Sequence, residues 1–153
     1  MIHAERIRPL NDRAPRTGRY VLYWMQASVR TRFNHALEHA IRRADESGLP
    51  VVTGFGLTDR YPEANARHYA FLLDGLRDVG AALAARGIPL VVRSGSPDAV
   101  ALELARDATR VGTDAGYLRH QGEWRRRVAD DARCLVEQVE SDVVVPVETA
   151  ASG

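Results

Sequence analysis

The sequence of 153 residues has one cysteine, no lysine and almost no net charge. Because the single Cys134 has no partner within the chain, an internal disulfide is excluded and a reducing cytoplasm is the expected compartment. All 21 basic residues are arginines, and 20 acidic residues balance them to a net charge of +1. This balance argues against the strong single-sign field of many nucleic-acid-binding proteins. We attribute the missing lysine to a compositional bias.

Long apolar runs are missing as well. No stretch approaches the roughly 20 apolar residues needed to cross a bilayer, and residues 1–6 lack the apolar segment of a secretory signal. We therefore expect a soluble, cytoplasmic protein with no membrane partner. Hydrophobic residues make up 45% of the chain, which is enough for a core and argues against disorder. The length predicts one domain.

Short apolar runs alternate with amphipathic segments along the chain. The apolar runs predict strands, and the segments with an apolar stripe of period 3.6 predict helices. Gly48 and Gly87 end two of these helices, and residues 96–98 (Ser-Pro-Asp) begin a third. We predict strands over residues 20–25, 49–55, 88–93, 109–113 and 134–139, and helices over residues 34–47, 65–86, 96 to about 108, and 123–133.

This alternation is typical of a parallel sheet with helices on both faces. We therefore predict an α/β fold: a Rossmann-like, doubly wound, five-stranded parallel sheet. Ligands of such folds bind beyond the carboxyl ends of the strands. Here the loops at that edge begin at residues 26, 54, 94 and 114.

The common nucleotide-binding motifs are missing from those loops. A dinucleotide site needs G-x-G-x-x-G directly after the first strand, where residues 26–30 contain no glycine. Gly54 and Gly56 lack the third glycine of that motif, and there is no P-loop. No spacing of Ser, Cys or His forms a recognisable nucleophile with its base. The residues by themselves indicate a ligand-binding α/β domain without visible catalysis.

Two local patterns allow a functional and a plainer interpretation. His35 and His39 share one helix face, a spacing that can bind a metal, but no third ligand is indicated. A partly exposed polar helix edge is the plainer interpretation. The arginines at 125–127 are compatible with nucleic-acid contact, but the acidic pair at 130–131 favours a solvated helix face. We predict no metal site.

Several strings, in order along the chain, resemble the N-terminal domain of class II cyclobutane pyrimidine dimer DNA photolyases (deoxyribodipyrimidine photo-lyases). The first spans YVLYWMQAS at residues 20–28 and NHALE at residues 34–38. Further similar strings occupy residues 55–59, 61–65, 67–69, 91–95, 116–119, 123–125 and 144–150. The resemblance covers nearly the whole chain.

This resemblance implies a light-driven DNA repair flavoprotein. In that family a reduced, light-excited FAD passes an electron to a thymine dimer and splits its cyclobutane ring. FAD and the flipped dimer bind in a C-terminal helical domain. By the resemblance, residues 20–147 form the α/β domain, residues 1–19 an N-terminal extension, and residues 148–153 the stub of a linker to an absent FAD-binding domain. We therefore expect no catalytic residue and no FAD on this chain, and no activity from it alone.

The resemblance also implies partners and a second cofactor. The FAD-binding helical domain and, in the full-length enzyme, damaged DNA are the partners. In related photolyases the α/β domain can hold an antenna chromophore, a deazaflavin or a folate, which passes excitation energy to FAD. A planar chromophore needs an apolar and aromatic slot with a few polar anchors. The candidate residues at the strand ends are Trp24, Gln26, Ser28, Phe55 and Asp114.

Two other functions stay open on the residues alone. One is a stand-alone Rossmann-like module that binds a nucleotide or a flavin. The other is an interaction scaffold without catalysis, whose partner domain would dock on an exposed apolar patch. Binding of adenosine nucleotides would favour the first, and self-association that a supplied helical domain abolishes would favour the second.

Overall fold

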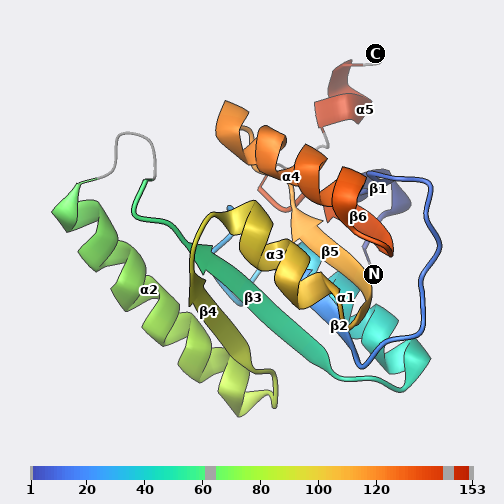
Figure 1. Ribbon diagram of the computed structural model, residues 1–153, viewed down its shortest axis with the longest axis horizontal. Coiled ribbons are helices and arrows are strands. Elements are labelled where there is room, and N and C mark those ends of the chain that lie inside the picture. Colours follow the sequence, from blue (N-terminus) through green and yellow to red (C-terminus); the bar gives the residue numbers. More distant parts are fainter. Residues whose placement is uncertain (1, 61–64, 143–146, 152–153) are drawn as a thin grey trace.

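A central sheet lies between two layers of helices in the computed structural model, which describes residues 2–60, 65–142 and 147–151 (Figure 1). The strands follow the order β1-β6-β5-β2-β3-β4, and every neighbouring pair is parallel except β1 with β6. The strands are β1 (Ile7–Pro9), β2 (Tyr20–Trp24), β3 (Val51–Leu57), β4 (Leu90–Ser94), β5 (Ala108–Asp114) and β6 (Leu135–Val139). The Rossmann-like α/β fold is thereby confirmed.

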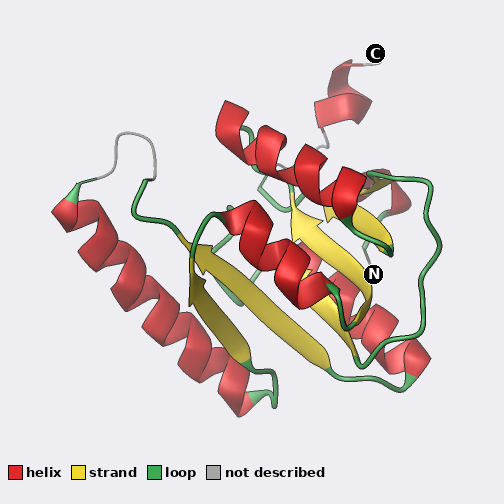
Figure 2. Cartoon of the chain, viewed as in Figure 1, coloured by secondary structure: helices red, strands yellow, loops and turns green. Residues whose placement is uncertain are grey.

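The helices alternate with these strands (Figure 2). They are the short 3-10 helix Ala4–Arg6, then α1 (His35–Ser47), α2 (Ala66–Ala85), α3 (Pro97–Ala105), α4 (Arg119–Asp131) and α5 (Val147–Ala151). Helix α4 begins four residues earlier than predicted. The Gln121 side chain accepts a hydrogen bond from the Leu118 backbone N–H at 3.2 Å, which supports this polar first turn.

The predicted number of strands needs one correction, because the sheet has six strands rather than five parallel ones. The additional strand β1 pairs antiparallel with β6, with Ile7 opposite Val139 and Pro9 opposite Glu137. Because β1 has only three residues, among them an arginine and a proline, its sequence shows no alternation of apolar and polar residues, and only the pairing with β6 identifies it as a strand. Proline is tolerated here because β1 forms the edge of the sheet.

The segment after β1 binds to the end of α4. Asn11 donates from its side chain to the carbonyls of Ala129 and Cys134, at 3.0 and 3.1 Å. Arg13 donates to the Ala129 carbonyl as well. The bonds to Ala129 satisfy a carbonyl in the last turn of α4, where the helix itself supplies no donor, and the bond to Cys134 reaches the residue just before β6. Residues 10–13 are thus fastened to the same layer as α4. The predicted domain boundaries themselves stay predictions.

Strand β2 is buried on both faces, as its continuous apolar run requires. Tyr23 and its neighbours in alternate positions pack against α1 and α2. Leu22 and Trp24 pack on the opposite face, against α3 and α4. The carboxyl end of β2 therefore opens between both helical layers, at the edge where the ligands of this fold class bind.

The first half of α2 is packed more loosely than the second. Leu76, Val79 and Leu83 are buried, whereas Phe71 is 81% and Leu73 46% exposed. Both of these apolar side chains of the first half are therefore open to solvent. No helix within the described ranges is long and apolar enough to cross a membrane. The strings noted at residues 61–65 and 144–150 lie partly outside the described residues.

Candidate functional site

An apolar hollow lies at the carboxyl ends of β2 and β3, and it is the strongest candidate site in the described part of the chain. Its inner part, of about 20 Å³, is lined by Met25, Gln26, Phe55, Gly56, Leu57, Thr58, Leu72, Pro97 and Trp124. An open outer part of about 520 Å³ is lined by Leu57, Thr58, Asp59, Tyr69, Ser94 and Gly95. Leu57 and Thr58 line both parts, so the two are adjacent. Three aromatic rings with a few polar groups are a suitable lining for a planar ligand.

The wall of this hollow depends on a glycine. A Cβ added to Gly56 would lie 2.6 Å from the Pro97 Cα, so the first turn of α3 approaches β3 as closely as a glycine allows. The two lining residues after Gly56, Leu57 and Thr58, continue out of this contact toward solvent. The close approach thus sets the position of the shared wall.

Beside the hollow, the Asp114 carboxylate holds the loop that follows β2. It accepts hydrogen bonds from the backbone N–H groups of Ala27 at 2.7 Å and Ser28 at 2.9 Å, and from that of Gln26 at 3.2 Å to each oxygen. The Tyr23 hydroxyl donates a further bond of 3.1 Å. Burial raises the pKa of Asp114 from its ordinary value, and these hydrogen bonds oppose that rise.

A second polar group connects the same loop to α4. The Gln26 side chain donates to the Gln121 carbonyl at 3.1 Å and accepts from the Arg125 guanidinium at 3.3 Å. Arg125 also donates to the Gly116 carbonyl at 2.8 Å. Burial lowers the pKa of Arg125, and the charge of Asp114 opposes this. The Arg125 side chain of α4 therefore connects the loop after β2 with the loop after β5.

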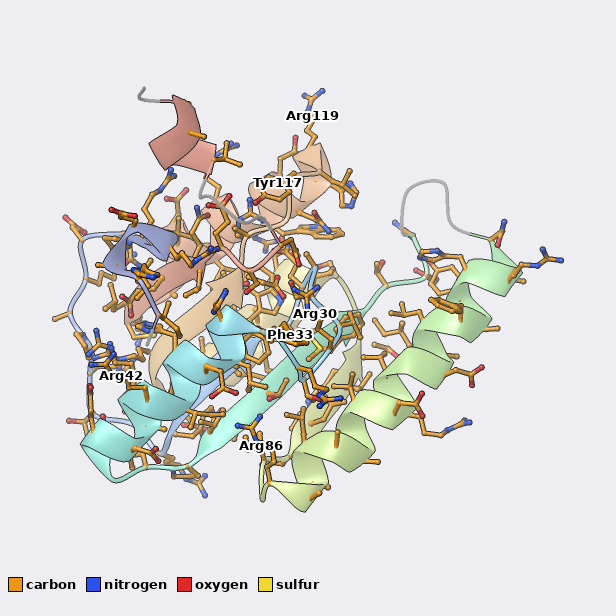
Figure 3. All side chains as sticks on the ribbon, turned by 180° about the vertical axis from the view of Figure 1, so that it is seen from behind. Arg30, Phe33, Arg42, Arg86, Tyr117 and Arg119 are labelled. Carbon is orange, nitrogen blue, oxygen red and sulfur yellow. The ribbon has the colours of Figure 1, made fainter. Side chains whose placement is uncertain are left out.

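On its other side, the β2–α1 loop is held by contacts of Ser28 and Arg30 with the Asp142 carboxylate. Ser28 donates from its hydroxyl to the Asp142 carboxylate, and Arg30 forms an ion pair with the same carboxylate at 2.7 Å. Arg30 also donates to the Phe33 carbonyl at 3.1 Å. Phe33 has a positive φ of 52° and a side chain that is 86% exposed, next to Arg30 in Figure 3. The loop thus presents an aromatic ring to solvent in a conformation that is costly for a bulky residue.

The predicted chromophore residues fall into two groups. Gln26 and Phe55 line the hollow. Trp24 packs in the core against α3 and α4, and its indole N–H has no hydrogen-bond acceptor among the described residues. Ser28 and Asp114 are used within the loop network rather than facing the hollow. Their role in cofactor binding stays a prediction.

The interpretation of the two histidines requires a correction. His39 is not on an exposed edge but is only 3% exposed, and its Nε2 lies 3.3 Å from the Glu137 carboxylate. Arg110 lies 3.3 Å from the same oxygen. His35 itself is partly exposed, and burial together with nearby positive charges, Arg6 and Arg30 foremost, lowers its pKa. Among residues 2–60, 65–142 and 147–151, no group of three or more His, Cys, Asp or Glu could hold a metal ion.

Sequence reasoning missed most of the lining of the hollow. The strand that was expected to end at residue 55 continues to Leu57, and Thr58 follows it, so a longer predicted strand would have pointed to both. Tyr69 is on the exposed turn of a helix, and Trp124 is in the arginine-rich segment of α4. Only the packing of α2 and α4 around the strand ends brings these rings together.

A DNA photolyase family model matches residues 21–153. The chain belongs to the DNA photolyase family. The deoxyribodipyrimidine photo-lyase of Methanothermobacter thermautotrophicus is 55% identical over 152 residues, which are 99% of this chain and 34% of that relative. The deoxyribodipyrimidine photo-lyase of Oryza sativa subsp. japonica is 34% identical over 155 residues, which cover 96% of this chain and 31% of the relative. The plant relative supports the class II resemblance.

This photolyase chain spans about a third of the length of the curated relatives it matches, and it corresponds to the N-terminal domain. Among solved structures, the universal stress protein UspA from Lactobacillus plantarum aligns with a TM-score of 0.58 at 14% identity, over 81% of this chain and 99% of that one. A universal stress protein from Archaeoglobus fulgidus in complex with dAMP aligns with a TM-score of 0.54 at 15% identity, over 78% of this chain and 96% of that one. At these identities the likeness shows the fold alone.

Proposed function

We propose that this domain belongs to a light-dependent enzyme that splits cyclobutane pyrimidine dimers in DNA. In this proposal it packs against an FAD-binding helical domain and holds an antenna chromophore, a deazaflavin or a folate, in the hollow at the carboxyl ends of β2 and β3. Membership of the photolyase family supports the first part. The apolar, aromatic hollow is the observation that supports the second.

The residues of the hollow fit a planar chromophore. Phe55, Tyr69 and Trp124 offer ring faces or edges, and aromatic pairs contribute about 0.5–1.5 kcal/mol each beyond their buried area. The half-buried Thr58 offers a polar anchor, and the amide of Gln26, which also bonds to Gln121 and Arg125, lines the inner part. When bound, the chromophore would supply light absorption and energy transfer, while the residues of the chain bind it, orient it and exclude water.

The described residues do not fit FAD in the same way. A dinucleotide in this fold binds its pyrophosphate at the loop after the first parallel strand. Here that strand is β2, and the N–H groups of its loop already donate to Asp114. This arrangement supports an FAD site outside the domain. It also counts against a stand-alone nucleotide-binding module, even though a fold neighbour was solved with dAMP.

Exposed apolar side chains support a docked partner domain. Phe33, Phe71 and Leu73 are 86%, 81% and 46% exposed. Tyr117 and Leu118, after β5, are also more than half exposed. Covering such residues would stabilise the assembly, by roughly 25 cal/mol for each Å² of apolar surface. This docked state is favoured over an interaction scaffold because the family of the chain is known.

Two arginines of α4, Arg125 and Arg127, have partners within the domain. Arg127 forms an ion pair of 2.9 Å with Asp98, and Arg125 binds Gln26 and Gly116. These contacts support a structural role for both side chains. We therefore propose that DNA is held by the FAD-binding domain, in line with the net charge of +1 on this chain.

Chromophore binding is tested with the purified chain and two probes, 8-hydroxy-5-deazaflavin and methenyltetrahydrofolate. Fluorescence titration should show saturable binding of one of them. Tyr69→Ala removes a ring from the hollow and should weaken binding about threefold to tenfold. Phe71→Ala, two residues along the same helix and outside the lining, is the matched control and should change it less than twofold. Absence of binding by either probe, or equal effects of the two variants, contradicts the antenna proposal.

A further inference from the structure

The strongest unassigned feature is the cluster of backbone donors around Asp114. We propose that Asp114 is the built-in occupant of an anion-binding site in the β2–α1 loop, and that it thereby determines which ligands this domain accepts. Its carboxylate fills the position where a doubly wound fold would bind a phosphate. A ligand at this end of the sheet must therefore bind without a phosphate in that loop. The inference holds whether or not a chromophore occupies the hollow.

The donors are arranged as in an anion site. The N–H groups of Gln26, Ala27 and Ser28 are consecutive, and all three converge on one carboxylate. Successive backbone N–H groups that point to one spot form a concave cluster that binds anions such as phosphate. Their place, directly after the first parallel strand of the sheet, is also the phosphate position of nucleotide-binding relatives of this architecture.

Hydrogen-bond donors surround the Asp114 carboxylate, as they would surround a bound anion. Four donors converge on its two oxygens, three backbone N–H groups and the Tyr23 hydroxyl, and the Gln26 N–H is shared between both oxygens. The side chain is fully buried. Charge-assisted hydrogen bonds of this kind are about twice as strong as neutral ones. The loop is therefore already satisfied and has no donor left among these three for an external anion.

The sheet explains why residue 114 supplies this group. β5 lies beside β2 in parallel register, with Thr113 opposite Trp24, so the last residue of β5 adjoins the start of the loop. The hydroxyl of Tyr23, in β2, also donates a hydrogen bond to Asp114. Asn34 in turn donates to the Tyr23 hydroxyl at 2.8 Å, which directs that hydroxyl proton toward the carboxylate. The surrounding polar groups are thus oriented for a negative charge.

The experiment replaces the built-in anion with an external one. Asp114→Ala leaves three buried N–H groups without an acceptor, which should lower the melting temperature strongly. Formate, the fragment removed, and inorganic phosphate are then added separately, with chloride at the same ionic strength as the reference. Both anions should raise the melting temperature of Asp114→Ala by several degrees more than that of the unaltered protein. Amide NMR should show that phosphate shifts the signals of residues 26–28 only in the variant.

Two further variants keep the test decisive. Thr113→Ala removes a neighbouring buried hydrogen bond, from its hydroxyl to the Trp24 carbonyl at 3.0 Å, and should lose stability without any anion-specific recovery. Asp114→Asn keeps the shape but removes the charge, and should show a smaller response of the same three amides to phosphate.

Four outcomes would overturn the proposal. One is a phosphate response at residues 26–28 of the unaltered protein. Another is the absence of an anion response in both Asp114 variants, including failure of both to fold in formate or phosphate. A third is recovery of Thr113→Ala equal to that of Asp114→Ala. Recovery with formate but not with phosphate would show that the loop excludes phosphate by its size, whatever residue 114 is.

Discussion

The side-chain amide of Asn34 donates a hydrogen bond of 2.8 Å to the hydroxyl of Tyr23. The same amide donates to the carbonyls of Ser28 and Arg30, at 3.3 and 2.9 Å, and the Asn34 Oδ1 accepts from the Leu37 N–H at 3.0 Å. One buried side chain therefore starts α1, closes the loop before it and orients the hydroxyl that faces Asp114. The loop beside the candidate site is held by this residue as much as by the sheet.

Asn34→Ala should therefore cost more than the loss of a helix cap. We expect a decrease of about 2–4 kcal/mol in the free energy of unfolding, about 1 from the cap and the rest from buried groups left without partners. Asn65→Ala is the control, because Asn65 caps α2 at an exposed position by accepting from the His68 N–H. It should cost about 1 kcal/mol. Urea unfolding measures both, and equal losses would contradict the role given to Asn34.

The sequence identified Asn34 as the start of a helix but not as the centre of a polar cluster. An N-cap is a local signal, readable from one asparagine before an amphipathic segment. Its bond to Tyr23 depends on how the first turn of α1 packs onto β2, which local patterns do not contain. For the same reason, Asp114 was recognised as a strand-end residue while its acceptance of three N–H bonds was not.

A buried ion pair makes the stability of the domain depend on pH. Burial alone would raise the pKa of Glu137, but the hydrogen bond with His39 and the positive charges of His39 and Arg110 hold it below its ordinary value of 4.5. A lowered folded-state pKa means that the ionised group stabilises the fold above pH 4.5. That contribution is lost as the pH falls through the lower folded-state pKa.

Glu137→Gln should remove this dependence. At pH 7 we expect a loss of about 1–3 kcal/mol in the free energy of unfolding, because hydrogen bonds to a charged group are replaced by neutral ones. The difference from the unaltered protein should shrink below about pH 4. Glu123→Gln, in an exposed pair with Arg119, should have little effect at either pH. A difference for Glu137→Gln that stays constant from pH 7 to pH 3 would contradict the assignment.

Glycine positions give a test of how α3 packs at the wall of the hollow. Gly56→Ala places a Cβ 2.6 Å from the Pro97 Cα, which should cost about 1–3 kcal/mol through displacement of α3. Gly75→Ala, in α2 with no atom within 4 Å of the added Cβ, should instead stabilise the chain by about 0.5–1 kcal/mol. Thermal unfolding compares the two. A harmless Gly56→Ala would show that the wall is not set by this contact.

More of the fold than of the candidate site could be predicted from the sequence. Apolar runs such as the one at β2 and helix stops such as Gly48 are local features, so four helices and five strands could be placed from them. Strand β1 could not, since its pairing with β6 is its only support. The hollow combines Phe55 from β3 with rings from α2 and α4, and only Phe55 lies at a strand end where reasoning from topology would look.

The most direct test of the proposed function is light-dependent repair by a chimeric enzyme. This chain replaces the corresponding third of the Methanothermobacter thermautotrophicus relative, to which it is 55% identical. The purified chimera, loaded with FAD, is illuminated with DNA that contains thymine dimers. Our account predicts dimer cleavage in light, none in the dark, and none by the isolated 153-residue chain. A chimera that folds and binds FAD but repairs no dimers, or cleavage by the isolated chain, would contradict it.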